Sequence, residues 1–441
     1  MKILFISIGC DKNLTDSEVM LGILAEEGYE MTDDETEADI IVINTCCFIH
    51  DAKEESIQNI LDMAEYKKTG RLKALIVTGC LAERYRQEIL DEIPEVDAVL
   101  GTTAYDKVSE AIQSALDGKV TVTMESLEAL PMPEAKRQIT TGGHFAYLKI
   151  AEGCDKHCTY CIIPKVRGRF RSVPMERLLK EARELAGQGV KELILVAQET
   201  TLYGKDLYGE KSLHRLLKEL CKINGIYWIR VMYCYPEEIY GGLIQVMKEE
   251  PKICHYLDLP VQHANDDILR RMGRKTSKRE LTDMIRKLRK EIPDICIRTT
   301  LITGFPGETQ EQYEELYRFV NEMEFDRLGV FTYSPEEGTP AAKMQDQVEE
   351  AVKEDRQAEL MELQQEIAFE AAENMAGKEV LVMIEGKVAD EAVYVGRTYR
   401  DAPNVDGLIF VEAGEELISG DFVKVKITGA LEYDLIGGLV E

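Results

Sequence analysis

The chain has 441 residues, enough for roughly three domains of about 150 residues each, and its hydrophobic fraction of 45% is sufficient for large cores. It carries 81 Asp and Glu against 53 Lys and Arg, a formal net charge of −28. This balance makes the protein a poor candidate for binding nucleic acid through its overall field, and it fits either a basic partner or a solvated acidic surface.

The first 118 residues alternate between strand-like and helix-like segments. Short apolar runs, typical of buried parallel strands, are found at 3–8, 38–44 and 73–79. Helical patterns follow at 15–28 and 51–67. The alternation predicts a doubly wound α/β domain over 1–118. Residues 119–142 contain two prolines and mixed charges, and we expect them to form a linker.

The apolar run at 3–8 is too short for the core of a secretory signal, and Asp11 and Lys12 follow almost at once. No run of about 18 apolar residues occurs anywhere, so we expect no membrane span. We therefore expect a cytoplasmic protein, in which thiols stay reduced. Eleven cysteines in that setting point to metal or cluster ligation.

A second alternating series covers 143–346. Its expected strands lie at 145–151, 192–198, 227–233, 256–261, 296–303 and 327–333. Its expected helices lie at 174–188, 212–222, 238–249, 277–290 and 309–323. Six βα-type units predict a partial (β/α) barrel, with its chemistry at the carboxyl ends of the strands.

The last 95 or so residues divide into two parts by pattern. Residues 347–376 are charged and lack Gly and Pro until Gly377, which predicts a long connecting helix. Residues 377–441 contain short strand-like runs between Gly and Asp turns, and Val423, Val425 and Ile427 alternate with lysines. We expect a small antiparallel β-barrel there.

The sharpest local motif is Cys154-Asp-Lys-His-Cys158-Thr-Tyr-Cys161, directly after the first expected barrel strand. Three thiolates within eight residues can bind one small metal centre. Structural zinc normally takes four ligands, and His157 is a sterically awkward fourth. A cubane iron–sulfur cluster with three irons bound by cysteine and one left open is the favoured interpretation.

Three further cysteines, Cys10, Cys46 and Cys80, each lie at or just beyond the carboxyl end of an expected parallel strand. Their separations of 36 and 34 residues match one strand–helix unit. Adjacent strand ends share one crevice, so the sequence predicts that these thiols converge on a second site. The alternative is that cysteines merely pack well at strand ends. Alternation would point the neighbouring Cys47 away from Cys46.

The three-cysteine motif resembles the signature of the radical S-adenosylmethionine (SAM) superfamily. That resemblance implies an open iron that chelates SAM and a reduced cluster that yields a 5′-deoxyadenosyl radical. The whole chain resembles the methylthiotransferase family, on the segments GCDKNLTDSE (9–18), NTCCFIHDAKEES (44–56), TGCLAERY (78–85), EGCDKHCTYCIIPKVRGRFRS (152–172) and GFPGET (304–309), with a TRAM-like terminal barrel. Position 47 departs from the family pattern, because it holds a cysteine where the family is expected to have glycine.

The family has two branches: one modifies an adenosine in transfer RNA, and the other an aspartate of small-subunit ribosomal protein twelve. The chain is more similar to the second branch in three segments, LPVQHANDDILRRMGR (259–274), FTYSPEEGTPAA (331–342) and RDAPNVDGLIFVE (400–412). Residues 377–441 hold 13 Asp and Glu against 6 Lys and Arg. A barrel that bound RNA would be expected to be basic, so the charge favours a basic protein substrate; transfer RNA is the alternative.

The resemblance implies two [4Fe-4S] clusters and two molecules of SAM. One SAM would methylate a sulfur at the Cys10, Cys46 and Cys80 cluster, and the other would give the radical at the Cys154, Cys158 and Cys161 cluster. The product would be a 3-methylthioaspartate. The implied partners are a basic ribosomal protein, a reductant of the flavodoxin or ferredoxin type and a sulfur donor, with no membrane and no direct nucleic-acid specificity.

Weaker signals lie at other expected strand ends. Gln198 and Thr200 end the second barrel strand, and Thr303 and Gly304 end the fifth, so all four are candidates for binding SAM. A structural role in turns is the alternative. Four basic residues follow the cysteine motif and would either neutralise a carboxylate or lie on a solvated strand edge: Lys165, Arg167, Arg169 and Arg171.

Overall fold

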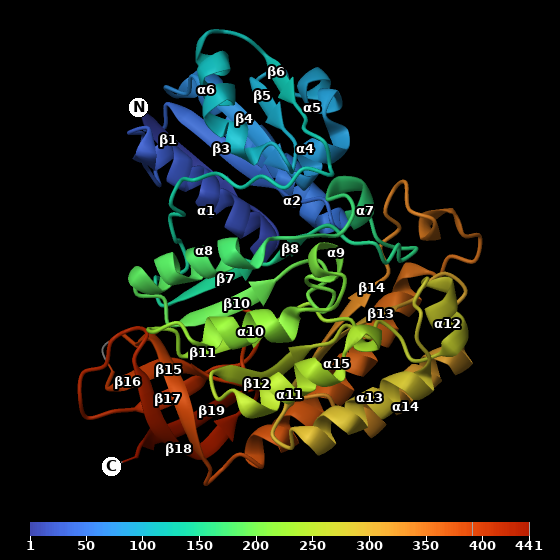
Figure 1. Cartoon of the computed structure of the whole chain (residues 1–441). Coiled ribbons are helices and arrows are strands. Elements are labelled where there is room, and N and C mark those ends of the chain that lie inside the picture. Colours follow the sequence, from blue (N-terminus) through green and yellow to red (C-terminus); the bar gives the residue numbers. More distant parts are fainter. Residues whose placement is uncertain (390, 441) are drawn as a thin grey trace.

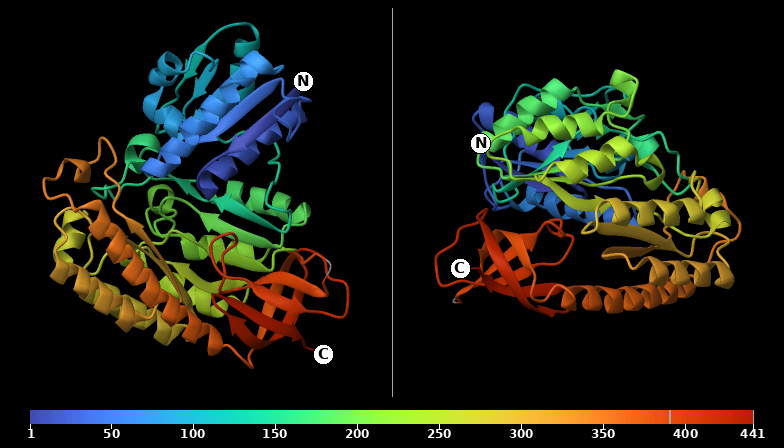
Figure 2. Two further views of the ribbon diagram at one scale, coloured as in Figure 1. Left: turned by 180° about the vertical axis from the view of Figure 1, so that it is seen from behind. Right: turned by 60° about the horizontal axis from the view of Figure 1, so that its bottom comes forward.

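The computed structural model describes residues 1–389 and 391–440. The chain forms an N-terminal sheet domain, a central barrel-like domain and a small C-terminal barrel (Figure 1). The N-terminal domain and the C-terminal barrel lie on opposite sides of the central domain (Figure 2). In the described residues, no helix combines the length and the apolar character needed to cross a membrane.

The N-terminal sheet has six parallel strands in the order β2-β1-β3-β4-β5-β6. Its strands are β1 (Lys2–Ser7), β2 (Glu30–Met31), β3 (Ile40–Thr45), β4 (Ala74–Gly79), β5 (Ala98–Leu100) and β6 (Thr121–Thr123). Its helices are α1 (Asp11–Glu26), α2 (His50–Ala64), α3 (Tyr66–Thr69), α4 (Cys80–Tyr85), α5 (Gln87–Glu92) and α6 (Val108–Leu116).

Helices cover both faces of this sheet, and every residue of β3 and β4 is therefore buried. Alternate residues serve two cores: Ile41 and Ile43 pack with α2, whereas Ile40 and Val42 pack with α1 and α6. The predicted doubly wound domain is confirmed.

The expected end of this domain at residue 118 is too early. Strand β6 lies within the segment 119–142 that the sequence suggested was a linker, and it pairs with β5. Thr-Val-Thr is too short to give a strand signal of its own. The other expected boundaries stay predictions.

The central sheet has the order β14-β13-β12-β11-β10-β7 and does not close. Its strands are β7 (Phe145–Lys149), β10 (Glu192–Val196), β11 (Trp228–Val231), β12 (Ile253–Asp258), β13 (Cys296–Thr303) and β14 (Arg327–Thr332). A two-stranded ribbon, β8 (Ala151–Glu152) and β9 (Arg171–Ser172), encloses the cysteine motif. The predicted partial barrel is confirmed.

Helices cover the outside of this sheet. They are α8 (Met175–Gly187), α9 (Lys205–Tyr208), α10 (Leu213–Cys221), α11 (Gly241–Glu249), α12 (Asp266–Arg271), α13 (Lys278–Glu291), α14 (Gln310–Met323) and α15 (Glu350–Glu373). The short helix α7 (Ile163–Val166) instead packs against α4 of the N-terminal domain. Helices α13 and α14 begin at capping boxes, with Ser277 and Thr309 as their N-caps. Helix α15, expected as a connector, also packs Leu360 and Leu363 into the barrel core.

The C-terminal strands form a closed barrel in the order β15-β16-β17-β19-β18. They are β15 (Glu379–Lys387), β16 (Val393–Thr398), β17 (Ile409–Glu412), β18 (Phe422–Leu431) and β19 (Asp434–Leu439). Val425 and Ile427 are buried and Lys424 and Lys426 are exposed, as the alternation predicts. Strands β17 and β19 pair in parallel, whereas the other described pairs are antiparallel, as expected.

The C-terminal barrel is attached near the amino ends of the central strands. Glu192, the first residue of β10, lies between Arg230 of β11 and Arg397 of β16, with N–O distances of 2.8 and 2.7 Å. Trp228 packs edge-on against Phe422, with ring centroids 4.8 Å apart. The opposite, carboxyl ends of the strands face the N-terminal domain (Figure 1).

Candidate active site

The N-terminal cysteines lie at the carboxyl ends of β1, β3 and β4. Cys10 is the N-cap residue of α1, Cys46 directly follows β3 and Cys80 is the first residue of α4. The strand order changes direction between β1 and β3, which is where open α/β sheets usually bind their ligands. The structure therefore places the three predicted residues around one crevice.

Two glycines allow these strand ends to approach closely. Gly9 has a φ of +99°, and a Cβ there would lie 3.0 Å from the Cys46 Sγ. Gly79 has a φ of +94°, and a Cβ there would lie 2.3 Å from the Asn44 Oδ1. The buried Asn13 side chain then joins β1 to β3 by donating to the carbonyl oxygens of Ile8 and Thr45, at 3.0 and 2.9 Å.

The three thiols interact electrostatically. Burial raises the pKa of Cys46, and the nearby Cys10 raises it further. Burial also raises the pKa of Cys80, where Arg167 opposes the shift and Cys47, Cys10 and Cys46 add to it. Cys47 is fully buried with its pKa raised to about 12 by burial, and Arg84 opposes this shift.

The second cysteine group lies in the loop between β8 and α7. Cys154 and Cys158 are buried and Cys161 is half-buried. Burial raises the pKa of Cys154 to about 12, with Cys158 among the smaller contributors. Burial likewise raises the pKa of Cys161, and Cys158 and Cys154 add to it. His157 is exposed, so the structure does not bring it into the group as a zinc ligand would require.

Each cysteine group supplies thiol donors, the ligands that iron–sulfur clusters take. Among residues 1–389 and 391–440, no three His, Cys, Asp or Glu side chains converge on a point that one metal ion could occupy. The other thiols of each group nevertheless lie close enough to raise the pKa of Cys80 and of Cys161, respectively. A set of three thiol donors fits a cubane iron–sulfur cluster that leaves one iron open.

The weaker candidates have different surroundings. Gln198 lies beside the second cysteine group, where its Oε1 accepts from the Gly153 N at 2.8 Å. The Thr200 hydroxyl donates to the Met232 carbonyl oxygen at 2.7 Å. The Thr303 hydroxyl donates to the Lys353 carbonyl oxygen at 3.2 Å, and a Cβ on Gly304 would meet the Lys353 side chain. SAM binding by these four residues stays a prediction.

Glu199 lies between Gln198 and Thr200 in the polar run that the sequence places at the end of the second barrel strand. It is fully buried, and its Oε2 has no hydrogen-bond partner among the described residues. Burial raises its pKa to about 7, against the effects of Thr201 and Lys156. The polar sequence Gln-Glu-Thr-Thr points to this strand end, but its unpartnered buried carboxylate is visible only in the structure.

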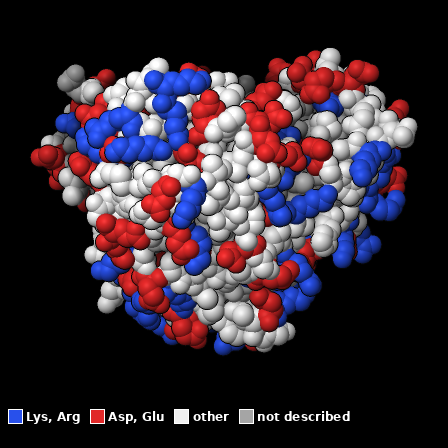
Figure 3. Space-filling view, turned by 90° about the horizontal axis from the view of Figure 1, so that it is seen from above, with Lys and Arg blue, Asp and Glu red and all other residues white. Residues whose placement is uncertain are grey.

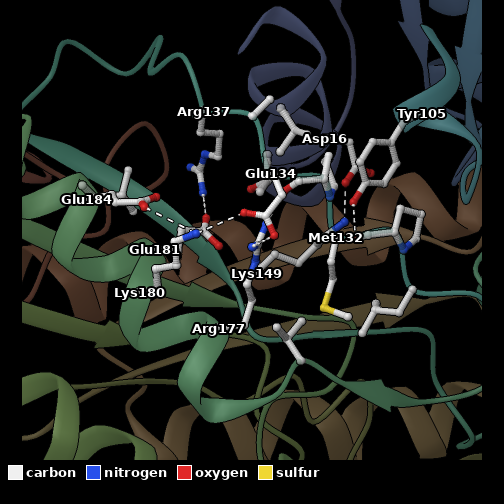
Figure 4. Close-up of a pocket in the computed structure, with 18 of the residues that line it drawn as sticks. Asp16, Tyr105, Met132, Glu134, Arg137, Lys149, Arg177, Lys180, Glu181 and Glu184 are labelled. Atoms are coloured by element: carbon white, nitrogen blue, oxygen red, sulfur yellow. Dashed lines mark hydrogen bonds and ion pairs between the residues drawn. The ribbon is translucent and has the colours of Figure 1, made fainter. Parts of the chain in front are cut away.

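The N-terminal domain is fixed to the barrel by buried ion pairs. Arg137 donates to Glu18 of α1 at 2.7 Å and to Glu181 of α8 at 2.6 Å. Lys149 of β7 contacts Asp16 of α1, beside a cavity of about 80 Å³ that Figure 4 shows. The two cysteine groups are thus held in a fixed relation across the domain boundary.

A second contact reaches the N-terminal domain from the loop after β14. The buried Glu336 lies 2.9 Å from the Lys53 Nζ and 3.0 Å from the Arg84 Nη1. Arg84 also donates to the carbonyl oxygen of Glu337 at 2.8 Å. This loop belongs to one of the segments that favoured the protein-modifying branch.

Three family models match the chain in succession. The uncharacterized protein family UPF0004 matches residues 2–101, the radical SAM superfamily matches 148–320 and the TRAM domain matches 376–440. The radical SAM match covers the Cys154 motif, and the first match covers Cys10, Cys46 and Cys80.

Curated relatives match the chain from end to end. A protein of Lachnoclostridium phytofermentans named ribosomal protein uS12 methylthiotransferase RimO is 65% identical over 99% of each chain. Proteins with the same name are 53% identical in Clostridium perfringens, over 99% of this chain and 97% of the relative, and 48% identical in Clostridioides difficile, over 100% and 99%. Nothing in these matches supports the transfer-RNA alternative.

Solved structures share the fold at low sequence identity. The radical SAM methyltransferase TsrM of Kitasatospora setae, with cobalamin and a [4Fe-4S] cluster bound, superposes with a TM-score of 0.56 at 13% identity, covering 88% of this chain and 81% of TsrM. The cobalamin-dependent radical enzyme OxsB gives a TM-score of 0.52 at 12% identity, covering 83% and 56%. These likenesses concern the fold alone.

Proposed function

Because the chain belongs to the family of ribosomal protein uS12 methylthiotransferases, we propose that it inserts a methylthio group at the β-carbon of an aspartate of uS12. The observation that carries this proposal is the pair of separate, largely buried three-thiol groups on the two sides of one domain boundary. A single radical centre would need only the second group. Sulfur insertion explains why the N-terminal domain supplies another.

The six cysteines have distinct tasks in this proposal. Cys154, Cys158 and Cys161 would hold one [4Fe-4S] cluster, and Cys10, Cys46 and Cys80 would hold the other. Together with SAM, the bound clusters supply radical hydrogen abstraction and a methylated sulfur. The protein holds the thiols, orients the Cys154 loop through Gln198 and shields most of both groups from water.

The charge of the chain supports a basic protein substrate. The C-terminal barrel segment 377–441 has 13 acidic against 6 basic residues, which is unfavourable for binding RNA phosphates. On the face seen from above in Figure 3, acidic groups lie among the basic ones rather than beside one continuous basic band. Proteins that are embedded in ribosomal RNA are generally basic, so this surface suits uS12.

The remaining partners are proposed from the reaction. Cluster reduction needs an electron donor, for which a flavodoxin or ferredoxin fits, and each turnover needs a sulfur donor. Such partners, the substrate and reduced thiols all fit a cytoplasmic protein.

Cysteine variants test the division of labour. Cys154→Ala should abolish SAM cleavage, whereas Cys46→Ala should retain some 5′-deoxyadenosine formation and lose methylthiolation. Cys221→Ala, on α10 of the barrel, serves as the matched control and should keep both. Full methylthiolation of uS12 by the Cys46→Ala protein would contradict the proposed role of the N-terminal thiols.

A further inference from the structure

Arg167 is buried at the boundary between the two cysteine groups. It follows α7, only six residues after Cys161, yet its side chain is just 2% exposed. Each of its three guanidinium nitrogens donates a hydrogen bond. Nε donates to the Cys80 Sγ at 3.3 Å, Nη1 donates to Asp16 at 2.8 Å and Nη2 donates to the Asn13 Oδ1. A barrel residue therefore contacts a thiol of the N-terminal domain.

Hydrogen bonds also link the Arg167 guanidinium to the loop that carries the second cysteine group. Nη1 also donates to the Glu152 Oε2 at 3.2 Å, and the other Glu152 oxygen accepts from the Gln198 Nε2 at 2.7 Å. Gln198 in turn accepts from the backbone N–H of Gly153, directly before Cys154. A continuous chain of polar contacts thus joins the Cys80 sulfur to the loop that carries the second group.

The two carboxylates do not need Arg167 for charge balance alone. Lys149 already contacts both of them, with its Nζ 2.9 Å from the Glu152 Oε2 and in contact with Asp16. A lysine at position 167 could complete the balance equally well. What an arginine adds is a planar fork with a separate Nε–H, which can serve a sulfur while the outer nitrogens serve oxygens.

We propose that Arg167 is a positioning residue that fixes the Cys80 sulfur by a charge-assisted hydrogen bond and couples it to the Cys154 loop. The proposal rests on the proposed function, in which Cys80 is a cluster ligand. Hydrogen bonds to ligand sulfurs withdraw electron density and raise the reduction potential of an iron–sulfur cluster. Arg167 therefore tunes the sulfur-carrying cluster from the domain that generates the radical.

The test isolates the N-terminal cluster in the full chain. Cys154, Cys158 and Cys161 are replaced together by alanine, so that only the cluster at Cys10, Cys46 and Cys80 can form. Arg167→Lys and Arg167→Gln are introduced into this parent. Arg169→Gln is the matched control, because Arg169 lies two residues away with its side chain 74% exposed. Iron content and midpoint potential are measured after anaerobic reconstitution.

We expect both Arg167 variants to show a more negative midpoint potential than the parent, and the Arg169 control to match the parent. Equal potentials at equal iron content would overturn the inference and leave the proposed function intact. A parent that binds no iron would instead overturn the proposed function.

Loss of iron in the Arg167 variants is also informative. If their unfolding midpoints match that of the parent apoprotein, selective loss of iron supports an action on the Cys80 site. If iron and stability are lost together in Arg167→Lys as well as in Arg167→Gln, Arg167 is a structural ion-pair partner and the inference fails.

Discussion

Replacing Glu192 by glutamine should loosen the C-terminal barrel from the central domain. Glu192 is fully buried and accepts from Arg230 at 2.8 Å and from Arg397 at 2.7 Å. The substitution keeps the shape of the side chain and removes its charge. It leaves two buried guanidinium groups with one neutral acceptor between them.

The expected loss follows from these contacts. A hydrogen bond to a charged group contributes about 1.5–3 kcal/mol, and breaking a buried ion pair costs about 3–5 kcal/mol. Arg397 keeps its bond to Glu385 and Arg230 keeps the Tyr399 carbonyl oxygen, which places the loss near the lower limit. We expect the free energy of unfolding to fall by about 3 kcal/mol.

Trp228 provides the assay. It is the single tryptophan of the chain and packs against Phe422 of the C-terminal barrel, so its fluorescence in urea reports this interface. Glu219→Gln is the matched control, because Glu219 is also paired at 2.6 Å, with Lys222, but its side chain is 42% exposed. The control should lose no more than about 0.5 kcal/mol. If the free energies of unfolding lost by Glu192→Gln and Glu219→Gln differ by less than about 1 kcal/mol, the buried ion pairs of Glu192 do not hold the two domains together as argued.

Two further predictions concern the N-terminal domain. The backbone N–H of Lys2 and neighbouring cations lower the pKa of Asp39 from 3.8 to about 2, although burial acts in the opposite direction. The stabilisation that the Asp39 carboxylate contributes is therefore present above pH 3.8 and is lost as the pH falls toward 2. Urea unfolding of the Asp39→Asn apoprotein should therefore differ most from the parent above that range, and a constant difference would contradict this. Gly9→Ala should reduce the iron bound per chain because its Cβ would meet the Cys46 Sγ, whereas Gly28→Ala, also at positive φ but in open space, should not. Equal iron content in both variants would contradict the packing argument.

The cysteine positions could be predicted because buried strands have a strong sequence signal. The apolar runs of β3 and β4 are fully buried, and their ends place Cys46 and Cys80. Strand β6 has no such signal, because its three residues are only half-buried at an edge of the sheet.

The polar residues of α1 could not be placed from the sequence. Asn13, Asp16 and Glu18 have the composition of an exposed helix start, and the helix was expected to begin only at residue 15. They are buried because their partners, Arg137 and Arg167, arrive from more than a hundred residues away in the chain.

Arg167 and Arg169 show the same limit at a single segment. Both follow the cysteine motif and both are basic, so composition does not separate them. In the segment between β8 and β9, the backbone directs Arg167 toward Cys80 and leaves the Arg169 side chain in solvent. Such a difference depends on the docking of two domains, which local sequence does not specify.

Mass spectrometry of the substrate shows directly whether the protein methylthiolates uS12. Reconstituted protein is incubated anaerobically with reductant, SAM, sulfide and uS12, and in parallel with transfer RNA. We expect the mass gain of one methylthio group on an aspartate of uS12 and no gain on the RNA. Unmodified uS12 in a mixture that still forms 5′-deoxyadenosine, or a gain on transfer RNA instead, would contradict it.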